Sequence, residues 1–302
     1  MPRCQRRVNI LRTPEERFAQ LPGFDFAPRY LETPGLAGIR VHYLDEGTGA
    51  ITFLCLHGQP TWSYLYRHMI APIVRAGHRV VAPDLIGFGR ADKPDDDAFY
   101  TFAMHRRMLV EFIEQLNLQQ IVLVCQDWGG LLGLTLPPEM PQRFRGLLIM
   151  NTAFASGDLP LGKGFSDWRA WSNANPDMNV GRLMLRSCPQ LSMAESAAYD
   201  APFLDVRYKA GVRRFPNLVP DRPDADGAAL SRAARDWWRT QWNGSSLMVI
   251  GMKDPVLGPA VMRVMRTHIR GCPPPIELPE GGHFVQERSA DFIDKAISDL
   301  TA

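Results

Sequence analysis

The fold of this chain is decided by one stretch, Ile121-Val122-Leu123-Val124-Cys125-Gln126-Asp127-Trp128-Gly129-Gly130. Its first half is a short apolar run, which is typical of a buried strand, and its second half begins a helix with small residues. The spacing Cys125-x-Asp127-x-Gly129 matches a sharp strand-to-helix turn whose backbone contacts tolerate only small flanking residues. The stretch therefore predicts that Asp127 is presented at the end of a strand.

Asp127 occupies the position where such a turn usually carries a serine. A serine that displaced a leaving group from saturated carbon would form an ether, which water does not cleave. The carboxylate of Asp127 is ionised at neutral pH and would form an ester, which an activated water hydrolyses. Asp127 thus indicates a two-step attack on saturated carbon rather than esterase, lipase or peptidase chemistry. The alternative is that it only caps the helix that begins near Trp128.

Two later residues supply partners for Asp127. Asp254 follows a strand-like run at residues 247–251, and His283 lies between a short apolar stretch and a C-terminal helical pattern. Nucleophile, acid and histidine follow one another in the order expected of this turn. We therefore predict a catalytic triad in which neutral His283 deprotonates water and ionised Asp254 orients its ring.

Helical patterns alternate with apolar runs along most of the chain, which predicts the α/β class with a mostly parallel sheet covered on both faces. A helix is expected at residues 101–116, where apolar residues recur at i, i+3, i+4 and i+7. The expected strands are residues 39–44, 51–56, 79–83, 121–125, 147–150, 247–251 and 276–278.

The alternation stops in the middle of the chain, where residues 156–236 carry helical patterns but no convincing buried strand. A capping box at Ser192-Met193-Ala194-Glu195 starts one of these helices. We predict a core formed by residues 1–155 and 237–302, and a helical cap inserted at residues 156–236. Such a cap would lie above the carboxyl ends of the strands and exclude water from the site.

The composition favours a single enzyme with no macromolecular ligand. The 302 residues are 45% hydrophobic, and the net charge of +2 comes from interspersed signs, so neither nucleic acid nor a membrane is an expected partner. Five scattered cysteines have no metal-ligand spacing, and Cys55 and Cys125, in predicted buried strands, are interpreted as core residues. No metal and no cofactor are expected, and the protein is predicted to be a cytoplasmic monomer.

A second loop is expected to help Asp127. His57-Gly58-Gln59-Pro60 follows the strand at residues 51–56, where this kind of fold places a backbone donor to a developing oxyanion. The predicted donors are the backbone N–H groups of Gln59 and Trp128, which would stabilise the tetrahedral intermediate formed when water attacks the ester. The alternative is a His-Gly turn needed only for its geometry.

Together these motifs resemble those of the haloalkane dehalogenases of the α/β-hydrolase superfamily, over nearly the whole chain. The likeness includes the cap, at Gly164-Phe165-Ser166-Asp167-Trp168. The segments that carry it in the core are His57-Gly58-Gln59-Pro60, Asp84-Leu85-Ile86-Gly87-Phe88-Gly89, Gln126-Asp127-Trp128-Gly129-Gly130, Gly251-Met252-Lys253-Asp254 and Gly282-His283-Phe284-Val285-Gln286-Glu287.

The resemblance implies an α/β-hydrolase fold with an inserted cap, and hydrolysis of haloalkanes to alcohol and halide through an alkyl ester of Asp127. It implies His283 as base, Asp254 as orienting acid, and the indole N–H groups of Trp128 and Trp168 as halide donors. A halide is a very weak base, so fixed N–H dipoles help its departure more than an acid does. The other main subfamily carries a Glu after the sixth strand, where this chain has Asn151.

The resemblance also implies an apolar substrate pocket, with a small haloalkane, water and halide as the only ligands. Several relatives carry Glu at the position of Gln59, so the function of its side-chain amide stays open between halide binding and positioning of water. The residues matching the pocket of relatives are Phe165, Phe215, Pro216, Val219, Val256 and Leu257.

The main alternative is an epoxide hydrolase, which uses the same Asp-His-Asp triad. Its alkoxide leaving group is a strong base that needs proton donors, and the cap offers Tyr199 and Tyr208. A fluoroacetate-type dehalogenase would carry Arg after the nucleophile, where this chain has Trp128. A noncatalytic binding protein of the same fold would usually have a broken triad.

Overall fold

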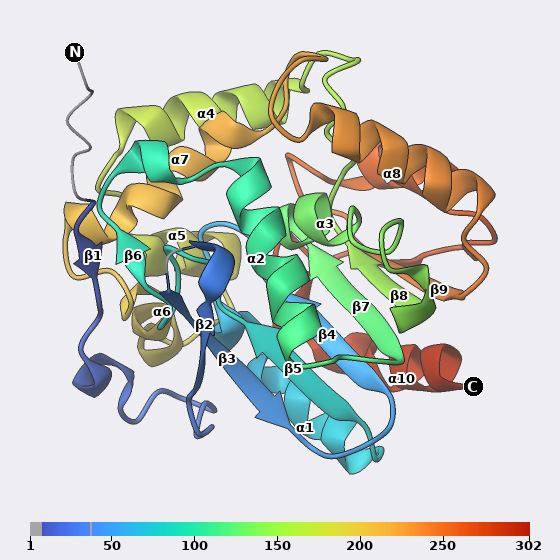
Figure 1. Cartoon of the computed structure of the whole chain (residues 1–302), viewed down its shortest axis with the longest axis horizontal. Helices are drawn as coiled ribbons and strands as arrows, with labels where there is room; N and C mark the ends of the chain where they lie inside the picture. Colours follow the sequence, from blue (N-terminus) through green and yellow to red (C-terminus); the bar gives the residue numbers. More distant parts are fainter. Residues whose placement is uncertain (1–7, 37) are drawn as a thin grey trace.

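An eight-stranded sheet forms the centre of the protein (Figure 1), which a computed structural model describes over residues 8–36 and 38–302. The strand order is β10-β9-β8-β7-β4-β5-β3-β2, and β1 pairs separately with β6. The strand bounds are β1 Ile10–Leu11, β2 Arg29–Thr33, β3 Ile39–Glu46, β4 Thr52–Leu56, β5 Arg79–Pro83, β6 Lys93–Pro94, β7 Ile121–Gln126, β8 Phe144–Met150, β9 Ser245–Gly251 and β10 Ile276–Leu278.

The sheet is mostly parallel, as predicted. All pairs from β5 through β4, β7, β8 and β9 to β10 are parallel, and only β2–β3 and β3–β5 are antiparallel. All seven predicted strands are present. The sequence did not reveal β2, because Arg29–Thr33 is a short edge strand with only one fully buried residue and no apolar run.

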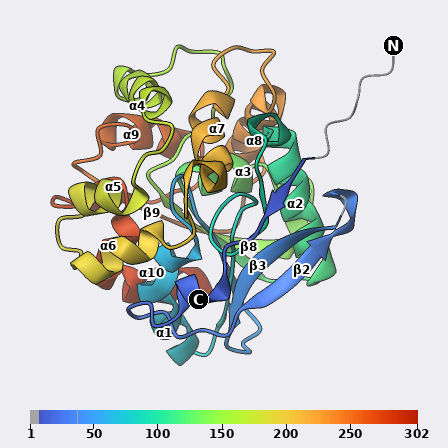
Figure 2. The ribbon, with the colours of Figure 1, turned by 90° about the vertical axis from the view of Figure 1, so that its left-hand side faces the viewer.

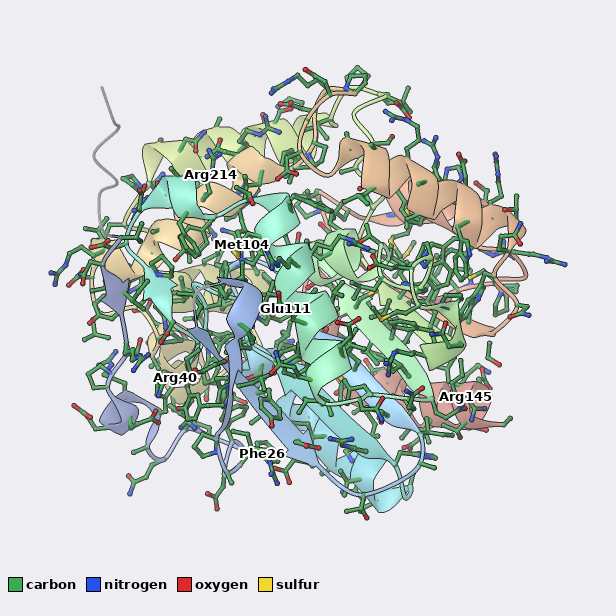
Figure 3. All side chains as sticks on the ribbon, in the orientation of Figure 1. Phe26, Arg40, Met104, Glu111, Arg145 and Arg214 are labelled. Carbon is green, nitrogen blue, oxygen red and sulfur yellow. The ribbon has the colours of Figure 1, made fainter. Side chains whose placement is uncertain are left out.

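Helices cover both faces of the sheet (Figure 1): α2 and α3 contact each other on one face, and α1 and α10 on the other. The predicted helix at residues 101–116 corresponds to α2, which buries Leu109, Phe112 and Ile113, whereas Glu111 pairs with Arg107 on its outer side (Figure 3). The helix bounds are α1 Arg67–Arg75, α2 Phe102–Gln115, α3 Asp127–Gly133, α4 Lys163–Ala174, α5 Val180–Ser187, α6 Met193–Asp200, α7 Ala210–Leu218, α8 Ala228–Thr240, α9 Pro259–Thr267 and α10 Ile293–Thr301.

The helices α4 to α7 gather at one end of the molecule (Figure 2). Residues 156–236 are all described and contain no strand, and the predicted capping box of Ser192 and Glu195 is formed at the start of α6. The expected boundary between residues 236 and 237 falls inside α8. The indole of Trp238 in α8 is buried and donates to the carbonyl oxygen of Leu134, 2.8 Å away.

The parallel strands end at one edge of the sheet. Leu56 at the end of β4 is paired with Cys125 of β7, and Gln126 of β7 is paired with Met150 of β8. Residues that directly follow these strands therefore meet at this edge. None of the helices in the described part of the chain is long and apolar enough to cross a membrane.

A buried arginine joins the core to the helical end. The side chain of Arg67, at the start of α1, is fully buried and contacts Glu287 at 2.6 and 2.8 Å, and Glu195 of α6 at 3.0 Å. Glu287 is itself buried and also accepts from the hydroxyl of Tyr199 in α6. Two carboxylates from different parts of the fold thus share one guanidinium.

We expect Arg67→Met to lower the free energy of unfolding by about 3–5 kcal/mol, because it leaves the buried carboxylate of Glu287 without its counter-ion. Urea unfolding followed by circular dichroism measures the loss. The matched control is Arg207→Met, since Arg207 pairs with Asp205 at the surface, where removing an ion pair costs about 1 kcal/mol or less. Equal losses in the two variants would contradict this prediction.

Candidate active site

Asp127 lies on a strained turn between β7 and α3. Its φ of 50° is in the left-handed region, which non-glycine residues rarely adopt. The neighbouring chain is very close: a Cβ added at Gly129 would lie 1.9 Å from the carbonyl oxygen of Leu56, and one at Gly58 would lie 2.4 Å from Oδ1 of Asp127. The small flanking residues noted in the sequence are therefore a steric requirement.

The carboxylate of Asp127 does not cap α3. Asp127 is the first residue of that helix, and the N-cap is Gln126, whose side chain makes no capping bond. Instead, Oδ1 of Asp127 accepts a hydrogen bond of 2.8 Å from the backbone N–H of Gln59, which belongs to the loop after β4. The capping interpretation is therefore wrong, and the contact with the expected backbone donor is present.

The structure brings His283 and Asp254 together with Asp127. Nδ1 of His283 lies 2.7 Å from Oδ2 of Asp254, and Nε2 lies 3.6 Å from Oδ2 of Asp127. Asp254 follows β9, and His283 lies just before η7, a 3-10 segment at Val285–Asp291. Residues 127, 254 and 283 thus meet at one edge of the sheet, in the arrangement predicted from their order.

Asp254 is held as an anion. Burial opposes its ionisation, but the imidazole of His283 and hydrogen bonds from His283, Asn151 and the Val256 N–H outweigh burial and lower the pKa of Asp254 to about 2. Nδ2 of Asn151 donates to Oδ2 at 2.7 Å, and the N–H groups of Val256 and Leu257 donate to Oδ1 at 2.8 and 3.1 Å. Asn151 therefore supports the acid rather than replacing it.

His283 lowers the pKa of Asp254, whereas the carboxylates of Asp254 and Asp127 raise the pKa of His283. Burial lowers the pKa of His283, but Asp254 and Asp127 outweigh it and raise that pKa to about 9. Burial also raises the pKa of Asp127, against the effects of His283 and of the N–H groups of Gln59 and Trp128. Removing the charge of Asp127 would therefore lower the pKa of His283, so that more of the histidine is neutral at a given pH.

A cavity of about 870 Å³ opens beside Asp127 and is lined by residues of the core and of α4, α5 and α7. Three predicted pocket residues line it: Phe165, Pro216 and Val256. Phe215, Val219 and Leu257 are not among its lining residues, and their part in the pocket stays a prediction. Neighbouring residues of a helix point about 100° apart, so Phe215 and Pro216 of α7 do not share one face.

Phe215 instead supports a residue of the site. It is fully buried, and its ring centroid lies 4.5 Å from that of Trp128 and 4.7 Å from that of Phe88. Such packing fixes the indole of Trp128 in place. The sequence pattern could suggest that Phe215 is near the site, but not on which side of Trp128 it lies.

Trp128 and Trp168 both line the cavity, and Trp171 stacks on Trp168 with ring centroids 5.4 Å apart. Among the residues that the structure describes, neither Trp128 nor Trp168 donates its indole N–H to a protein acceptor. By contrast, the indoles of Trp238 and Trp242 donate to Leu134 and Ser246. Trp171 also lines the cavity without donating its indole N–H, and the buried indole of Trp62 has no acceptor among the described residues either, so an unused N–H does not by itself single out Trp128 and Trp168.

The side chain of Gln59 is directed toward the helical end of the molecule. Its Nε2 donates to the carbonyl oxygen of Val212 in α7 at 3.1 Å, and the residue is buried. One amide hydrogen is therefore engaged by the backbone of α7. This contact, which the sequence could not reveal, ties the loop after β4 to a helix about 150 residues further along the chain.

Comparisons with known proteins agree with this geometry. The family model described as alpha/beta hydrolase fold matches residues 51–290. The haloalkane dehalogenase of Psychrobacter cryohalolentis is 42% identical, with 96% of this chain and 97% of the relative covered. That of Mycobacterium marinum is 41% identical, with 96% and 99% covered.

A solved structure agrees closely as well. The tetrameric haloalkane dehalogenase DpaA from Paraglaciecola agarilytica NO2 is 47% identical with a TM-score of 0.95, and 97% of this chain and 99% of that chain are covered. The chain therefore belongs to the α/β-hydrolase fold family and, within it, to the haloalkane dehalogenases. The predicted fold and the predicted enzyme class, a hydrolase acting on carbon–halide bonds, are confirmed.

We expect Gly129→Ala to lower the free energy of unfolding by about 1–3 kcal/mol or more, because its Cβ forces β4 away from the turn. Thermal unfolding and halide release measure the two consequences, and halide release should fall as Asp127 shifts. The control is Gly162→Ala, since a Cβ there meets nothing within 4 Å. A Gly129 variant as stable and active as the control would show that the turn is not sterically limited.

Proposed function

We propose that this protein hydrolyses haloalkanes to an alcohol and a halide through a covalent ester of Asp127. The observation that carries the proposal is a carboxylate on the strained turn, facing a cavity that Trp128 and Trp168 line with indole N–H groups engaged by no acceptor among the described residues. The ligands are a small haloalkane, water and halide, with no metal or cofactor. The three-part division into core and cap stays a proposal too.

In the first step, a carboxylate oxygen of Asp127 attacks the carbon that bears the halogen. Oδ1 is engaged by the Gln59 N–H, so Oδ2 is the oxygen with the less compensated charge and the better nucleophile. The carbon–halogen bond breaks as the carbon–oxygen bond forms. The leaving halide then accepts hydrogen bonds from the indoles of Trp128 and Trp168, which need no reorganisation because neighbouring rings pack on both.

In the second step, water attacks the Cγ atom of the Asp127 ester while Nε2 of His283 takes its proton. Alkylation has by then neutralised Asp127, so Asp254 alone of these two carboxylates still raises the pKa of His283. The pKa of His283 therefore falls, and a larger fraction of the imidazole is neutral and able to act as the base. The negative charge that develops on the former carbonyl oxygen is stabilised by the N–H groups of Gln59 and Trp128. As this intermediate collapses, the Cγ–oxygen bond to the alkyl group breaks and the departing oxygen takes the proton from His283, which releases the alcohol. The Asp127 carboxyl group then loses its proton to solvent, which restores the carboxylate.

The arrangement of tyrosines favours halide over alkoxide as the leaving group. The hydroxyl of Tyr199 is buried and donates to Glu287, and neither Tyr199 nor Tyr208 lines the cavity. An epoxide hydrolase needs such hydroxyl groups beside the nucleophile, and no tyrosine of the described chain is among the residues lining this cavity. Trp128 likewise occupies the position where a fluoroacetate-type enzyme would need Arg.

Assembly and location remain expectations. The Paraglaciecola relative is tetrameric, whereas the sequence led us to expect a monomer, and light scattering of the purified protein distinguishes these states. The cytoplasmic location is likewise proposed, in keeping with free, buried thiols at Cys55, Cys125, Cys188 and Cys272.

A single turnover in heavy-oxygen water tests the covalent route. If Asp127 is the nucleophile, the alcohol takes its oxygen from the carboxylate, and the label enters the peptide that contains Asp127. If Asp127 is a general base, water attacks the substrate carbon directly, and the label appears only in the alcohol. We expect a labelled peptide and unlabelled alcohol in the first turnover, measured by mass spectrometry; the reverse distribution would refute the ester.

We expect Trp168→Phe to weaken halide binding by about one to two powers of ten, because it removes one charge-assisted hydrogen bond worth roughly 1.5–3 kcal/mol. Quenching of protein fluorescence by added bromide measures the affinity, and the halide burst measures bond cleavage. Trp171→Phe is the matched control, since Trp171 lines the same cavity and stacks on Trp168. A larger loss in the Trp171 variant would show that Trp171, and not Trp168, is the halide donor.

A further inference from the structure

Gln126 contacts the histidine of the site, although the reaction as derived so far does not use it. It is the last residue of β7 and is fully buried. Its Nε2 lies 2.8 Å from Nε2 of His283 and 3.2 Å from the carbonyl oxygen of the same residue. When the ring of His283 is neutral with its proton on Nδ1, both hydrogens of the amide have acceptors on that residue.

The orientation of this amide is set by His283. The Oε1 atom of Gln126 is buried and has no hydrogen-bond partner among the described residues. Turning the amide over would bring Oε1 against the carbonyl oxygen of His283, where the two oxygens would repel. A buried amide with an unpaired oxygen is costly, and an apolar side chain would pack at the end of β7 without that cost, so stability alone does not explain Gln126.

We propose that Gln126 is a positioning residue that holds His283 in the neutral form with its proton on Nδ1. A donor on Nε2 leaves Nδ1 as the protonated nitrogen, and Nδ1 faces Oδ2 of Asp254 at 2.7 Å. The ring is thus fixed between an amide on one side and a carboxylate on the other. This inference rests on the proposed function, in which neutral His283 is the base.

The charged groups around His283 explain why such a donor is useful. The carboxylates of Asp254, after β9, and Asp127, on the turn, both favour the imidazolium. Lys253, Glu280 and Arg288 line the same cavity, and Lys253 and Glu280 pair with each other. A hydrogen bond donated to the neutral ring opposes protonation, so Gln126 counteracts the carboxylates.

The consequence falls on the second step alone. Once Asp127 is an ester, Asp254 is the one remaining carboxylate against the ring, and Gln126 favours the neutral base. The attacking water then replaces the Gln126 N–H at the Nε2 lone pair. Its proton passes to Nε2 as its oxygen bonds to Cγ of Asp127. Halide departure involves no proton and does not depend on Gln126.

The test is Gln126→Met, which keeps the length of the side chain and removes the donor. Rapid mixing with a bromoalkane across pH separates halide release from ester hydrolysis. We expect the halide burst to stay within about twofold and the acid limb of hydrolysis to move up by about one pH unit, since a hydrogen bond is worth about as much as one pKa unit. Hydrolysis at pH values on the acid limb should then be about tenfold slower.

Gln286→Met is the matched control, because Gln286 is also fully buried and lies three residues after His283. It should leave the acid limb in place. An unmoved limb in the Gln126 variant, or equal slowing of both steps, would overturn the inference while leaving the proposed function intact. Absence of any halide release from the unmodified protein would overturn the proposed function itself.

Nitrogen-15 NMR of His283 gives a second readout that does not depend on turnover. With Gln126 present, the neutral ring should carry its proton on Nδ1, and its titration should lie at lower pH than in Gln126→Met. If Gln126→Met unfolds, Gln126→Glu serves instead, since a carboxylate accepts at Nε2 and should raise the titration of His283 further. An identical titration in all folded forms would refute a positioning role.

Discussion

The close approach of two backbones at the end of β7 is the constraint on which the rest of the site depends. Gly129 lies against the carbonyl oxygen of Leu56, and Gly58 lies against the carboxylate of Asp127, with no room for a Cβ at either position. This approach forces Asp127 into the left-handed region. It also brings the N–H of Gln59 within hydrogen-bond distance of Oδ1. One steric requirement thus presents the nucleophile and aligns its oxyanion donor.

The carboxylates of Asp254 and Asp127 have different roles because their electrostatic surroundings differ. Asp254 is surrounded by donors from His283, Asn151 and the following backbone, so it stays ionised and its role is fixed. Asp127 has fewer donors and is next to the cavity, so its charge is the one that chemistry can remove. The basicity of His283 therefore depends on whether Asp127 is free or esterified, which links the second step to completion of the first.

Much of this could be predicted from particular residues. Asp127, Asp254, His283 and Gln59 could be predicted because each follows a strand or belongs to a short motif whose spacing is local, whereas the expected halide donors came from the resemblance to the family. Which of the expected pocket residues line the cavity could not be predicted, because a helix or loop position does not say which neighbour faces the cavity: Phe165, Pro216 and Val256 line it, whereas Phe215, Val219 and Leu257 are not among its lining residues. The edge strand β2 was missed because it is short, has one fully buried residue and contains no apolar run.

The sequence by itself determined seven strands of the sheet, the chemistry of the nucleophile and the identity of its expected partners, since these depend on residue type and local spacing. Only the tertiary structure decided which side chains touch across the sheet edge. Arg67 joins Glu195 and Glu287 over long separations in the chain, Gln59 is tied to α7, and Gln126 donates to the carbonyl oxygen of His283. Such contacts depend on how distant elements pack, and no periodicity or motif encodes the distance between two atoms so far apart in sequence.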